Sequence, residues 1–258
     1  MLVAVWIYTI VIFLLPVLFI TVWKKKTGAR IKPFWIGMVT FLLFAMVLEQ
    51  CSHAIFLVLP WSGSKYITDH TWAYALYGCL AAGFFEETGR CCAFDKWLKD
   101  CWKRQDAVTY GIGHASCEII CITGMGAVSY LMMLYNPSIG NAAAVSSLSA
   151  LTLVLGVAER LIASALHISL SIFVFTAVKA GRKRLYLLAI ALHMIADVPA
   201  VLYQRAVIKN MILVELIMTS ITAVIAFFAY KMYRSLPNDG ADLVHTTVSA
   251  DETDSDTL

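Results

Sequence analysis

The chain has 258 residues, of which 60% are hydrophobic and only 14% are charged. Soluble domains carry about a quarter of their residues as charged side chains, so this composition excludes both a water-soluble globular protein and a disordered one. The formal net charge of +3 conceals an asymmetry. Six acidic residues and no Lys or Arg follow Ser235, which leaves 20 basic against 11 acidic residues, or +9, in the rest of the chain.

Seven hydrophobic stretches are long enough to cross a bilayer as α-helices, which takes about 20 residues. In chain order they comprise residues 2–23, 34–59, 71–94, 107–134, the long stretch 142–178, 185–203 and 211–233. The fifth stretch exceeds one crossing at about 1.5 Å per residue, so we expect an interfacial or kinked segment before Gly156. The sequence therefore predicts an all-α, polytopic membrane protein with about seven transmembrane helices.

The lysine and arginine residues predict how these helices are oriented. Fifteen of them lie in the first, third and fifth connections and after the last stretch, whereas the second, fourth and sixth connections hold three. Because basic loops stay in the cytoplasm, we expect the N-terminus outside and the C-terminus inside a bacterial-type cytoplasmic membrane. The basic clusters thus act as topology signals, and we expect no nucleic-acid partner.

The two ends of the chain fit this organisation. Residues 2–23 lack a basic leader and a small-residue cleavage site and precede Lys24, Lys25 and Lys26, which is typical of a retained anchor. We expect residues 1–234 to form one transmembrane domain, with a site on its third to sixth helices. Residues 235–258 are expected to form an acidic, disordered cytoplasmic tail. The seven cysteines are odd in number and lie mostly within the hydrophobic stretches, so we expect no disulfide framework.

Ionisable residues remain inside the hydrophobic stretches, where each costs roughly 2.5 kcal/mol or more at the bilayer centre unless it is paired or hydrated. They are Glu49, His53, Glu86, Glu87, Arg90, His114, Glu118, Glu159, Arg160, His167, His193, Asp197 and Glu215. Three sets have the helical spacing that places their members on one face: Glu86 and Glu87 with Arg90, His114 with Glu118, and His193 with Asp197. Their number predicts a polar interior shared between helices.

Helical rise places these sets at one depth. Glu86 and Glu87 lie roughly 10–12 Å from the cytoplasmic end of the third helix, and His114 and His193 lie about 10 and 12 Å from the corresponding ends of theirs. His167 on the fifth helix lies at roughly 16 Å, close to the level of the remaining carboxylates, and whether it reaches the site stays open. We therefore expect a shared cavity in the cytoplasmic half of the membrane.

These side chains suit hydrolysis inside a membrane. Imidazoles and a carboxylate are ligands that zinc uses in catalytic sites, which keep an open position for water. A second carboxylate could take the proton from that water, while Arg90 would hold the adjacent glutamates in geometry and ionisation.

Other polar residues in the stretches have a structural interpretation. We interpret His53, with Glu49 one turn away, as a hydrogen-bonded packing residue, because both lie in the outer half of the second helix. Glu159 and Arg160 are adjacent and are expected to pair with each other, although Arg160 shares a helix face with His167.

The motifs resemble those of a known group of membrane enzymes. Residues 86–90, EETGR, resemble the EExxR signature of the CAAX prenyl endopeptidase and bacteriocin-processing superfamily. Two motifs follow in the same order: an aromatic residue four positions before a histidine, here Tyr110 and His114, and a histidine four positions before Asn or Asp, here His193 and Asp197. Residues 111–118, GIGHASCE, are most similar to the GxGHxxxE form of the YhfC family of intramembrane metalloproteases, with PrsW-type proteases as more distant relatives.

The resemblance covers the third to the sixth stretch and has small departures. Tyr110 stands where phenylalanine is commoner, and Ala115 and Ser116 stand where glycine is frequent. These changes bear on the size of the cavity and remove no chemical group that hydrolysis requires.

The resemblance implies a multi-span peptidase whose site opens toward the cytoplasm. By motif position, Glu86 would be the water-activating base, Glu87 its partner or a metal ligand, and His114, His193 and Asp197 the remaining ligands or oxyanion-stabilising groups. The candidate catalytic residues are Glu86, Glu87, Arg90, His114, Glu118, His193 and Asp197, and the candidate ligands of a zinc ion are Glu87, His114 and His193.

We therefore expect a metal- or glutamate-dependent intramembrane endopeptidase that cleaves a membrane-associated protein or peptide in contact with membrane lipid. Three other functions stay open: a transporter coupled to an ion or solute through the same cluster, an inactive binding or immunity protein on the same scaffold, and a haem protein using paired histidines. Carriers usually show inverted repeats and access from both sides of the membrane. This sequence shows no repeat, and its cluster lies on one side.

Overall fold

The structure is a computed structural model that describes residues 1–136, 138 and 148–236. Within these residues the regular elements are all helices, without a strand, as the sequence predicts. Most of the expected acidic tail, residues 237–258, lies outside the described residues. The division into a transmembrane domain and a tail therefore stays a prediction.

Six helical segments of the described chain are long and apolar enough to cross a membrane. They are α1 (Leu2–Thr27), the segment Lys32–Val58, the segment Arg104–Tyr135, α9 (Ala150–Lys179), α10 (Lys183–Gln204) and α11 (Met211–Ser235). Lys32–Val58 is continuous and comprises α2 (Lys32–Leu43), η1 (Phe44–Glu49), α3 (Gln50–His53) and η2 (Ala54–Val58). Arg104–Tyr135 comprises α6 (Arg104–Glu118), η4 (Ile119–Gly124) and α7 (Met125–Tyr135). The predicted stretches lie within a few residues of these bounds, except that the start of the fifth, residues 142–147, lies outside the described residues.

The remaining predicted span forms α5 (Thr71–Cys92), which continues into η3 (Ala93–Trp97). With 22 residues α5 is long enough to cross a bilayer. It is not among the apolar six, and it carries Glu86, Glu87 and Arg90. The number of seven crossings and the orientation of the termini therefore stay predictions.

Two local features differ from the sequence expectations. α9 is continuous from Ala150 to Lys179, and the Ser149 hydroxyl caps it by accepting from the Thr152 amide, so no break in the helix separates Ala150 from Gly156. Residues 139–147, where an interfacial segment was also expected, lie outside the described residues. A short helix that the sequence analysis does not predict, α4 (Ser62–Asp69), connects η2 to α5. The segments η1 to η4 are π-helical, a feature that local sequence does not reveal and that is frequent at functional sites.

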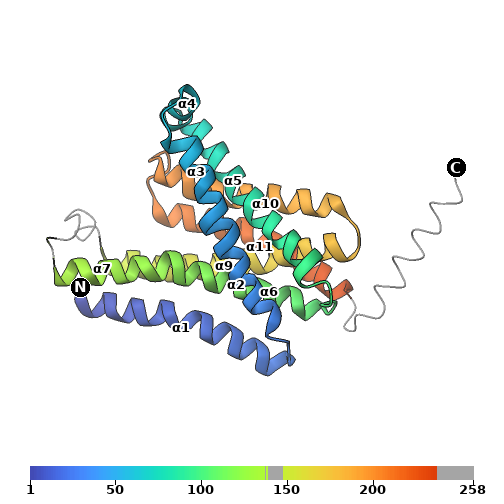
Figure 1. The fold of residues 1–258 in the computed structure, drawn as a ribbon. Coiled ribbons are helices and arrows are strands. Elements are labelled where there is room, and N and C mark those ends of the chain that lie inside the picture. The colour runs from blue at the N-terminus through green and yellow to red at the C-terminus, as the bar shows by residue number, and fades with distance from the viewer. Residues whose placement is uncertain (137, 139–147, 237–258) are drawn as a thin grey trace, which may run out of the picture.

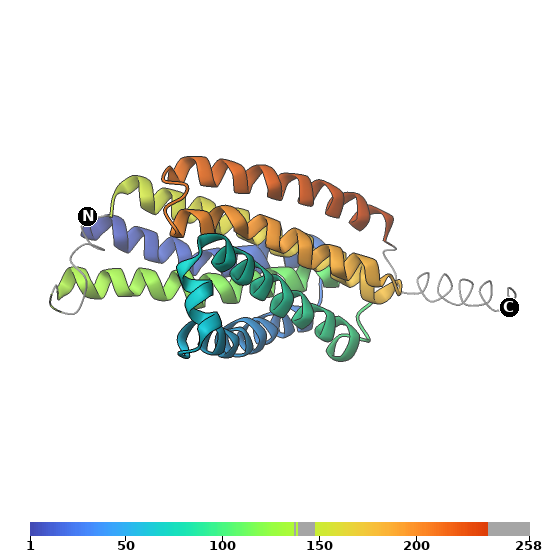
Figure 2. The same ribbon diagram turned by 90° about the horizontal axis from the view of Figure 1, so that it is seen from above.

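The helices form two groups that cross. Figure 1 shows the continuous segment α2–η2 and the helix α5 running side by side at a steep angle across the layer that contains α1, α6–α7 and α9. Seen from above, the helices α1, α6–α7, α9, α10 and α11 run roughly along one direction (Figure 2). The closest packed pairs are α2 with α6, α5 with α10, α6 with α9, and α9 with α11. The central helices α5, α6, α9 and α10 are those on which the sequence predicts the site.

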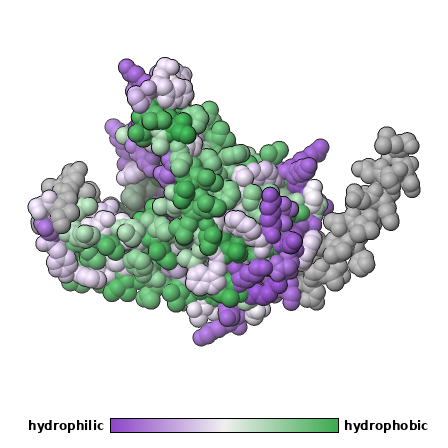
Figure 3. All heavy atoms as spheres, viewed as in Figure 1, coloured by the Kyte–Doolittle hydropathy of each residue, from purple (hydrophilic) through white to green (hydrophobic). Residues whose placement is uncertain are grey.

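The outer surface is that of a membrane protein. Figure 3 shows hydrophobic residues over most of one face, including α1, α2 and α7. Hydrophilic residues gather at α4 and toward the end where α1 finishes and α6 begins. Large side chains such as Ile7, Leu14 and Leu18 of α1 are more than half exposed, which is compatible with lipid and not with water.

Glycines allow α6 to approach its two neighbours closely. A Cβ on Gly113 would lie within 3.0 Å of the backbone of Phe34 in the segment that begins α2, and one on Gly111 would lie within 3.0 Å of the Ile168 Cα of α9. Small residues at such contacts are the usual means by which membrane helices pack. The two glycines of the GIGH motif therefore fit α6 between α2 and α9.

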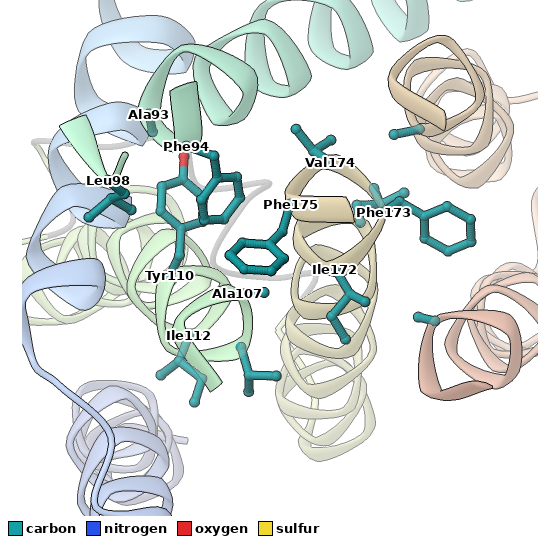
Figure 4. Close-up of a cluster of buried hydrophobic side chains, with 14 of the residues drawn as sticks. Ala93, Phe94, Leu98, Ala107, Tyr110, Ile112, Ile172, Phe173, Val174 and Phe175 are labelled. Atoms are coloured by element: carbon teal, nitrogen blue, oxygen red, sulfur yellow. The ribbon is translucent and has the colours of Figure 1, made fainter. Parts of the chain in front are cut away.

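An aromatic core and a buried lysine join α5 to α6 and α9 at one end. Phe94 lies with its ring centroid 4.7 Å from that of Tyr110 and 5.3 Å from that of Phe175 (Figure 4). The Lys179 ammonium, at the end of α9, donates to the carbonyl oxygens of Phe94 at 3.2 Å and Leu98 at 3.0 Å. Because carbonyls at a helix end have no partner within the helix, Lys179 caps η3 from a different helix.

The close contact of α2 with α6 is tested by the variant Gly113→Ala. We expect it to lower the midpoint of thermal unfolding of the detergent-purified protein, because the new methyl group meets backbone that cannot rotate away, and overpacking costs about 1–3 kcal/mol. Gly126→Ala on α7 is the matched control, since nothing lies within 4 Å of its Cβ position, and its midpoint should stay equal or rise slightly. Equal midpoints for both variants would contradict the contact.

Candidate functional site

The three charged residues of the EETGR motif lie on one face of α5 and are buried. The side chains of Glu87 and Arg90 have no exposed area, and that of Glu86 is 11% exposed. Arg90 Nη1 donates to Glu87 Oε1 in a buried ion pair, and Arg90 Nη2 lies 3.7 Å from Glu86 Oε2. One guanidinium therefore compensates two adjacent carboxylates, as the spacing predicts.

His193 of α10 is held by Glu87. Its Nδ1 lies 2.7 Å from Glu87 Oε1, and because an ionised carboxylate only accepts hydrogen bonds, Nδ1 carries the proton and donates. In the neutral ring the lone pair is then on Nε2, which lies 3.9 Å from Glu86 Oε2 and 3.5 Å from Asp197 Oδ2. Glu87 thus directs Nε2 toward the other two carboxylates.

His167 of α9 is held in a similar way from the opposite side. Arg90 Nη2 donates to His167 Nδ1 at 2.8 Å, and since arginine has no acceptor, Nδ1 carries a lone pair. The other ring nitrogen, Nε2, therefore carries the proton and donates to Glu118 Oε2 at 2.7 Å. Its Nδ1 lies 3.7 Å from Glu86 Oε2. His167, which the sequence left open, reaches the centre of the cluster.

His114 of α6 completes the contacts of Glu86. Its Nε2 lies 2.8 Å from Glu86 Oε2, and its ring packs edge-on against Phe41 at 5.0 Å between centroids. Its Nδ1 is buried and has no hydrogen-bond partner among the described residues. Glu86 Oε2 thus lies within 3.9 Å of a nitrogen atom of three imidazoles and of one guanidinium.

A second arginine extends the network. Arg160 of α9 pairs with Glu159, as expected from their adjacency, through Nε at 2.6 Å and through Nη2. It also donates from Nη1 to Glu118 Oε1 at 2.8 Å. Sequence reasoning missed this second role, although the seven-residue spacing of Arg160 and His167, two turns along one helix face, is the signal that could have revealed it.

The structure brings all seven predicted catalytic residues into one connected network, to which His167 and Arg160 also belong. The members are Glu86, Glu87, Arg90, His114, Glu118, His193 and Asp197. The most exposed member of the network is Asp197, whose side chain is 28% exposed. The catalytic roles of these residues stay predictions.

One donor set within the network could hold a metal ion. Glu86, His167 and His193 each offer a ligand atom, and these atoms lie within 4.8 Å of one another. Of the ligands predicted from sequence, His193 belongs to this set. Glu87 is instead turned toward Arg90 and His193 Nδ1, and His114 Nε2 toward Glu86.

The chemistry of the set fits a divalent metal. Each of its two imidazoles has its other ring nitrogen on a carboxylate, Glu87 or Glu118, which is the arrangement that fixes the tautomer of metal-binding histidines. Charge points the same way. Two guanidinium groups meet five carboxyl groups, those of Glu86, Glu87, Glu118, Glu159 and Asp197. With all of them ionised the network carries three excess negative charges, of which a divalent cation would offset two.

The polar residues of the second predicted helix form a separate chain. His53 Nε2 lies 3.3 Å from Glu49 Oε1, and His53 Nδ1 lies 3.0 Å from the Tyr77 hydroxyl, which also contacts the Ser52 hydroxyl at 3.1 Å. His53 is therefore a hydrogen-bonded histidine, as predicted. It makes no contact with the donor set among the described residues.

Two mostly apolar grooves of the described surface are lined by no residue of this network. One of about 560 Å³ is lined by apolar residues of α1 and α9, among them Tyr8, Val157 and Leu161. Another, of about 640 Å³, is lined by residues of α1, α6 and α9, among them Trp23, Ile112 and Leu161. The chemistry of the polar cluster, and not groove size, therefore identifies the candidate site.

Comparison with known proteins places the chain in a family. The model of the family described as YhfC intramembrane metalloprotease matches residues 11–218, and the chain belongs to this family. A protein of Bacillus subtilis (strain 168) described as an uncharacterized membrane protein YhfC is 35% identical over 239 residues, which cover 86% of this chain and 92% of the relative. No solved structure matches the chain. The membrane-protein relative and the six apolar helices together identify the chain as a multi-pass membrane protein.

Because the two adjacent glutamates have different surroundings, we expect their substitution to lower the free energy of unfolding by different amounts. We expect Glu87→Gln to lower the free energy of unfolding by about 3–5 kcal/mol, because it leaves Arg90 buried without its full partner. Glu86→Gln should cost clearly less, since Glu86 is partly exposed and 3.7 Å from Arg90. Thermal unfolding of both variants in the same detergent measures the difference, and coincident unfolding curves would contradict the assignment of Glu87 as the buried partner.

Proposed function

We propose that this member of the YhfC family is an intramembrane endopeptidase that hydrolyses a peptide bond of a membrane-associated protein or peptide with an activated water, and that its metal is zinc. The observation that carries the proposal is the convergence of Glu86, His167 and His193, with each imidazole held by a carboxylate. The motif resemblance to CAAX prenyl endopeptidases, as a wider superfamily, supports the same reaction class.

In this proposal some residues hold the zinc ion, and others orient the imidazoles that bind it. His167 Nδ1 and His193 Nε2 would hold the zinc ion, with Glu86 as a third ligand or as the base beside it, and the ion would take the place of Arg90 Nη2 on the His167 Nδ1 lone pair. When bound, it would activate a water and polarise the scissile carbonyl. Glu118 and Glu87 orient the two imidazoles. Arg90 keeps Glu87 ionised by its direct contact and so preserves the hydrogen bond to His193.

Glu86 is the carboxylate of the EE pair that can act on water. Glu87 is fully buried and already accepts from Arg90 and His193, whereas Glu86 is partly exposed and lies beside both candidate ligand nitrogens. At this place a carboxylate either completes the coordination of the metal or takes the proton of the attacking water. Asp197, whose Oδ2 lies 3.5 Å from His193 Nε2, is the most exposed carboxylate of the network.

Zinc content tests the metal part of the proposal. We expect near-stoichiometric zinc, about one ion per chain, in protein purified in detergent without chelators, and its loss in His167→Ala and His193→Ala because each removes a ligand. His53→Ala is the matched control, since it removes an imidazole outside the donor set. Absence of zinc from the wild type would contradict the metal, and equal loss in His53→Ala would point to general unfolding.

The Glu86→Gln variant tests the reaction. We expect this variant to abolish cleavage. Membrane peptides should then accumulate in cells that express the wild type and be absent from otherwise identical cells that express Glu86→Gln. Zinc retained by this variant would identify Glu86 as the base, and zinc lost would identify it as a ligand. Identical peptide patterns for wild type and variant would count against a peptidase and favour a carrier or a binding protein.

We further propose that α5 is a membrane crossing, which gives seven spans with the N-terminus outside and the C-terminus in the cytoplasm. The distribution of lysine and arginine supports this orientation. Alkaline phosphatase, which is active only outside the cytoplasm, should be active when fused after Asp69 and inactive when fused after Gly181. The opposite activities would reverse the orientation, and β-galactosidase fusions at the same positions provide the control.

A further inference from the structure

A single carboxylate joins two residues of α9. Glu118 of α6 accepts from Arg160 Nη1 through Oε1 at 2.8 Å and from His167 Nε2 through Oε2 at 2.7 Å. Arg160 and His167 are seven residues apart, so they lie two turns apart on the same face of α9. All three side chains are nearly buried, with 5–13% of their area exposed.

We propose that Arg160 is a positioning residue of the site, which acts through Glu118 to fix the ring orientation and the tautomer of His167. The inference rests on the proposed function, in which His167 Nδ1 is a metal ligand. With Nε2–H held by Glu118, the lone pair of a neutral His167 is on Nδ1, the atom that lies 3.7 Å from Glu86 Oε2. A ring turned over, or protonated on Nδ1 instead, would present no lone pair there.

The geometry of Arg160 suits this role better than that of a lysine would. Its Nε and Nη2 are engaged by Glu159, so the guanidinium is anchored on its own helix and Nη1 is directed at Glu118. The planar fork of arginine serves two carboxylates at once with fixed directions, whereas a lysine ammonium is a single point charge. Glu118 is thereby prevented from rotating away from His167.

Helix packing brings Glu118 within reach. Gly111, seven residues before Glu118 and on the same face of α6, meets the backbone of Ile168, the residue after His167. The two backbones are close at that level because glycine has no side chain. A glutamate two turns farther along α6 then spans the short distance to α9.

The same unit occurs twice around the donor set. Arg90, Glu87 and His193 repeat the sequence of contacts that Arg160, Glu118 and His167 make: arginine to carboxylate, carboxylate to imidazole. Arg90 and Glu87 come from the EETGR motif of α5, whereas Arg160 lies on α9 in no motif that the sequence analysis singled out. This repetition is a reason to assign Arg160 to the site and not only to the pair with Glu159.

Zinc affinity in a double-mutant cycle tests the inference. We expect Arg160→Gln to weaken zinc binding about 10–100-fold, the effect of losing a group that orients a ligand. In the Glu118→Ala background, which keeps all three candidate ligands, the same substitution should cause no further loss, because the carboxylate through which Arg160 acts is absent. Affinity is measured by competition with a chelator of known zinc affinity, and thermal unfolding confirms that each variant is folded. Arg160→Lys, which retains the charge without the fork, provides a milder variant if Arg160→Gln does not fold.

The outcomes separate this inference from the function on which it rests. An equal loss of affinity with and without Glu118 would show a general structural role and overturn the inference, as would an unchanged affinity in Arg160→Gln and Arg160→Lys when the wild type binds zinc. A wild type that binds no zinc would overturn the proposed metal as well. Arg205→Gln is the matched control. It removes an arginine that donates to the Thr68 carbonyl oxygen outside the network, so its zinc affinity should equal that of the wild type.

Discussion

The neutralisation of buried carboxylates by arginine is the interaction on which this molecule depends. A carboxylate in a membrane interior costs several kcal/mol unless a cation and hydrogen-bond donors compensate it. Arg90 is fully buried against Glu87 and also contacts Glu86 and His167, so α5 and α9 meet at one guanidinium. α10 and α6 then follow, because His193 and His114 donate to the same two carboxylates. The polar network thus fixes which faces of four helices point inward, and the apolar residues fill the space around it.

Close backbone contacts make this convergence possible, because short polar side chains span only a few ångströms. Gly113 lets α6 touch the start of α2, Gly111 lets it touch α9, and a Cβ on Gly83 of α5 would lie 2.9 Å from the Ile190 carbonyl oxygen of α10. Without such contacts the carboxylates and imidazoles would be separated by side chains of ordinary size. The GIGH motif therefore combines a packing function with a chemical one, since its glycines bring α6 close to α2 and α9 while its histidine contacts Glu86.

Much of this could be predicted from the sequence. Hydropathy located the helices, and spacing of three or four residues identified the pairs, because the geometry of one helix follows from its sequence alone. The rotation of one helix against another does not follow from the sequence of either helix alone. His167 could be placed at the right depth but not in the centre, since its direction depends on the contact of Gly111 with Ile168. Glu87, predicted as a ligand, also contacts His193, and Arg160, predicted only to pair with Glu159, also contacts Glu118, and both of these partners are far away in the chain. The π-helical segments escaped for the same reason, because packing and not local preference selects them.

The buried ammonium of Lys179 has a mechanical consequence. It fastens the last turn of α9 to the carbonyl oxygens that end the α5–η3 segment, so separating the two helices there would strand a charge and several acceptors at once. Farther along, the same helices are joined by Arg90 and His167, a contact of one hydrogen bond. Relative movement of α5 and α9 is therefore least costly as a pivot about the lysine. Such a hinge would widen the gap on the side of the imidazoles while the opposite end stays closed.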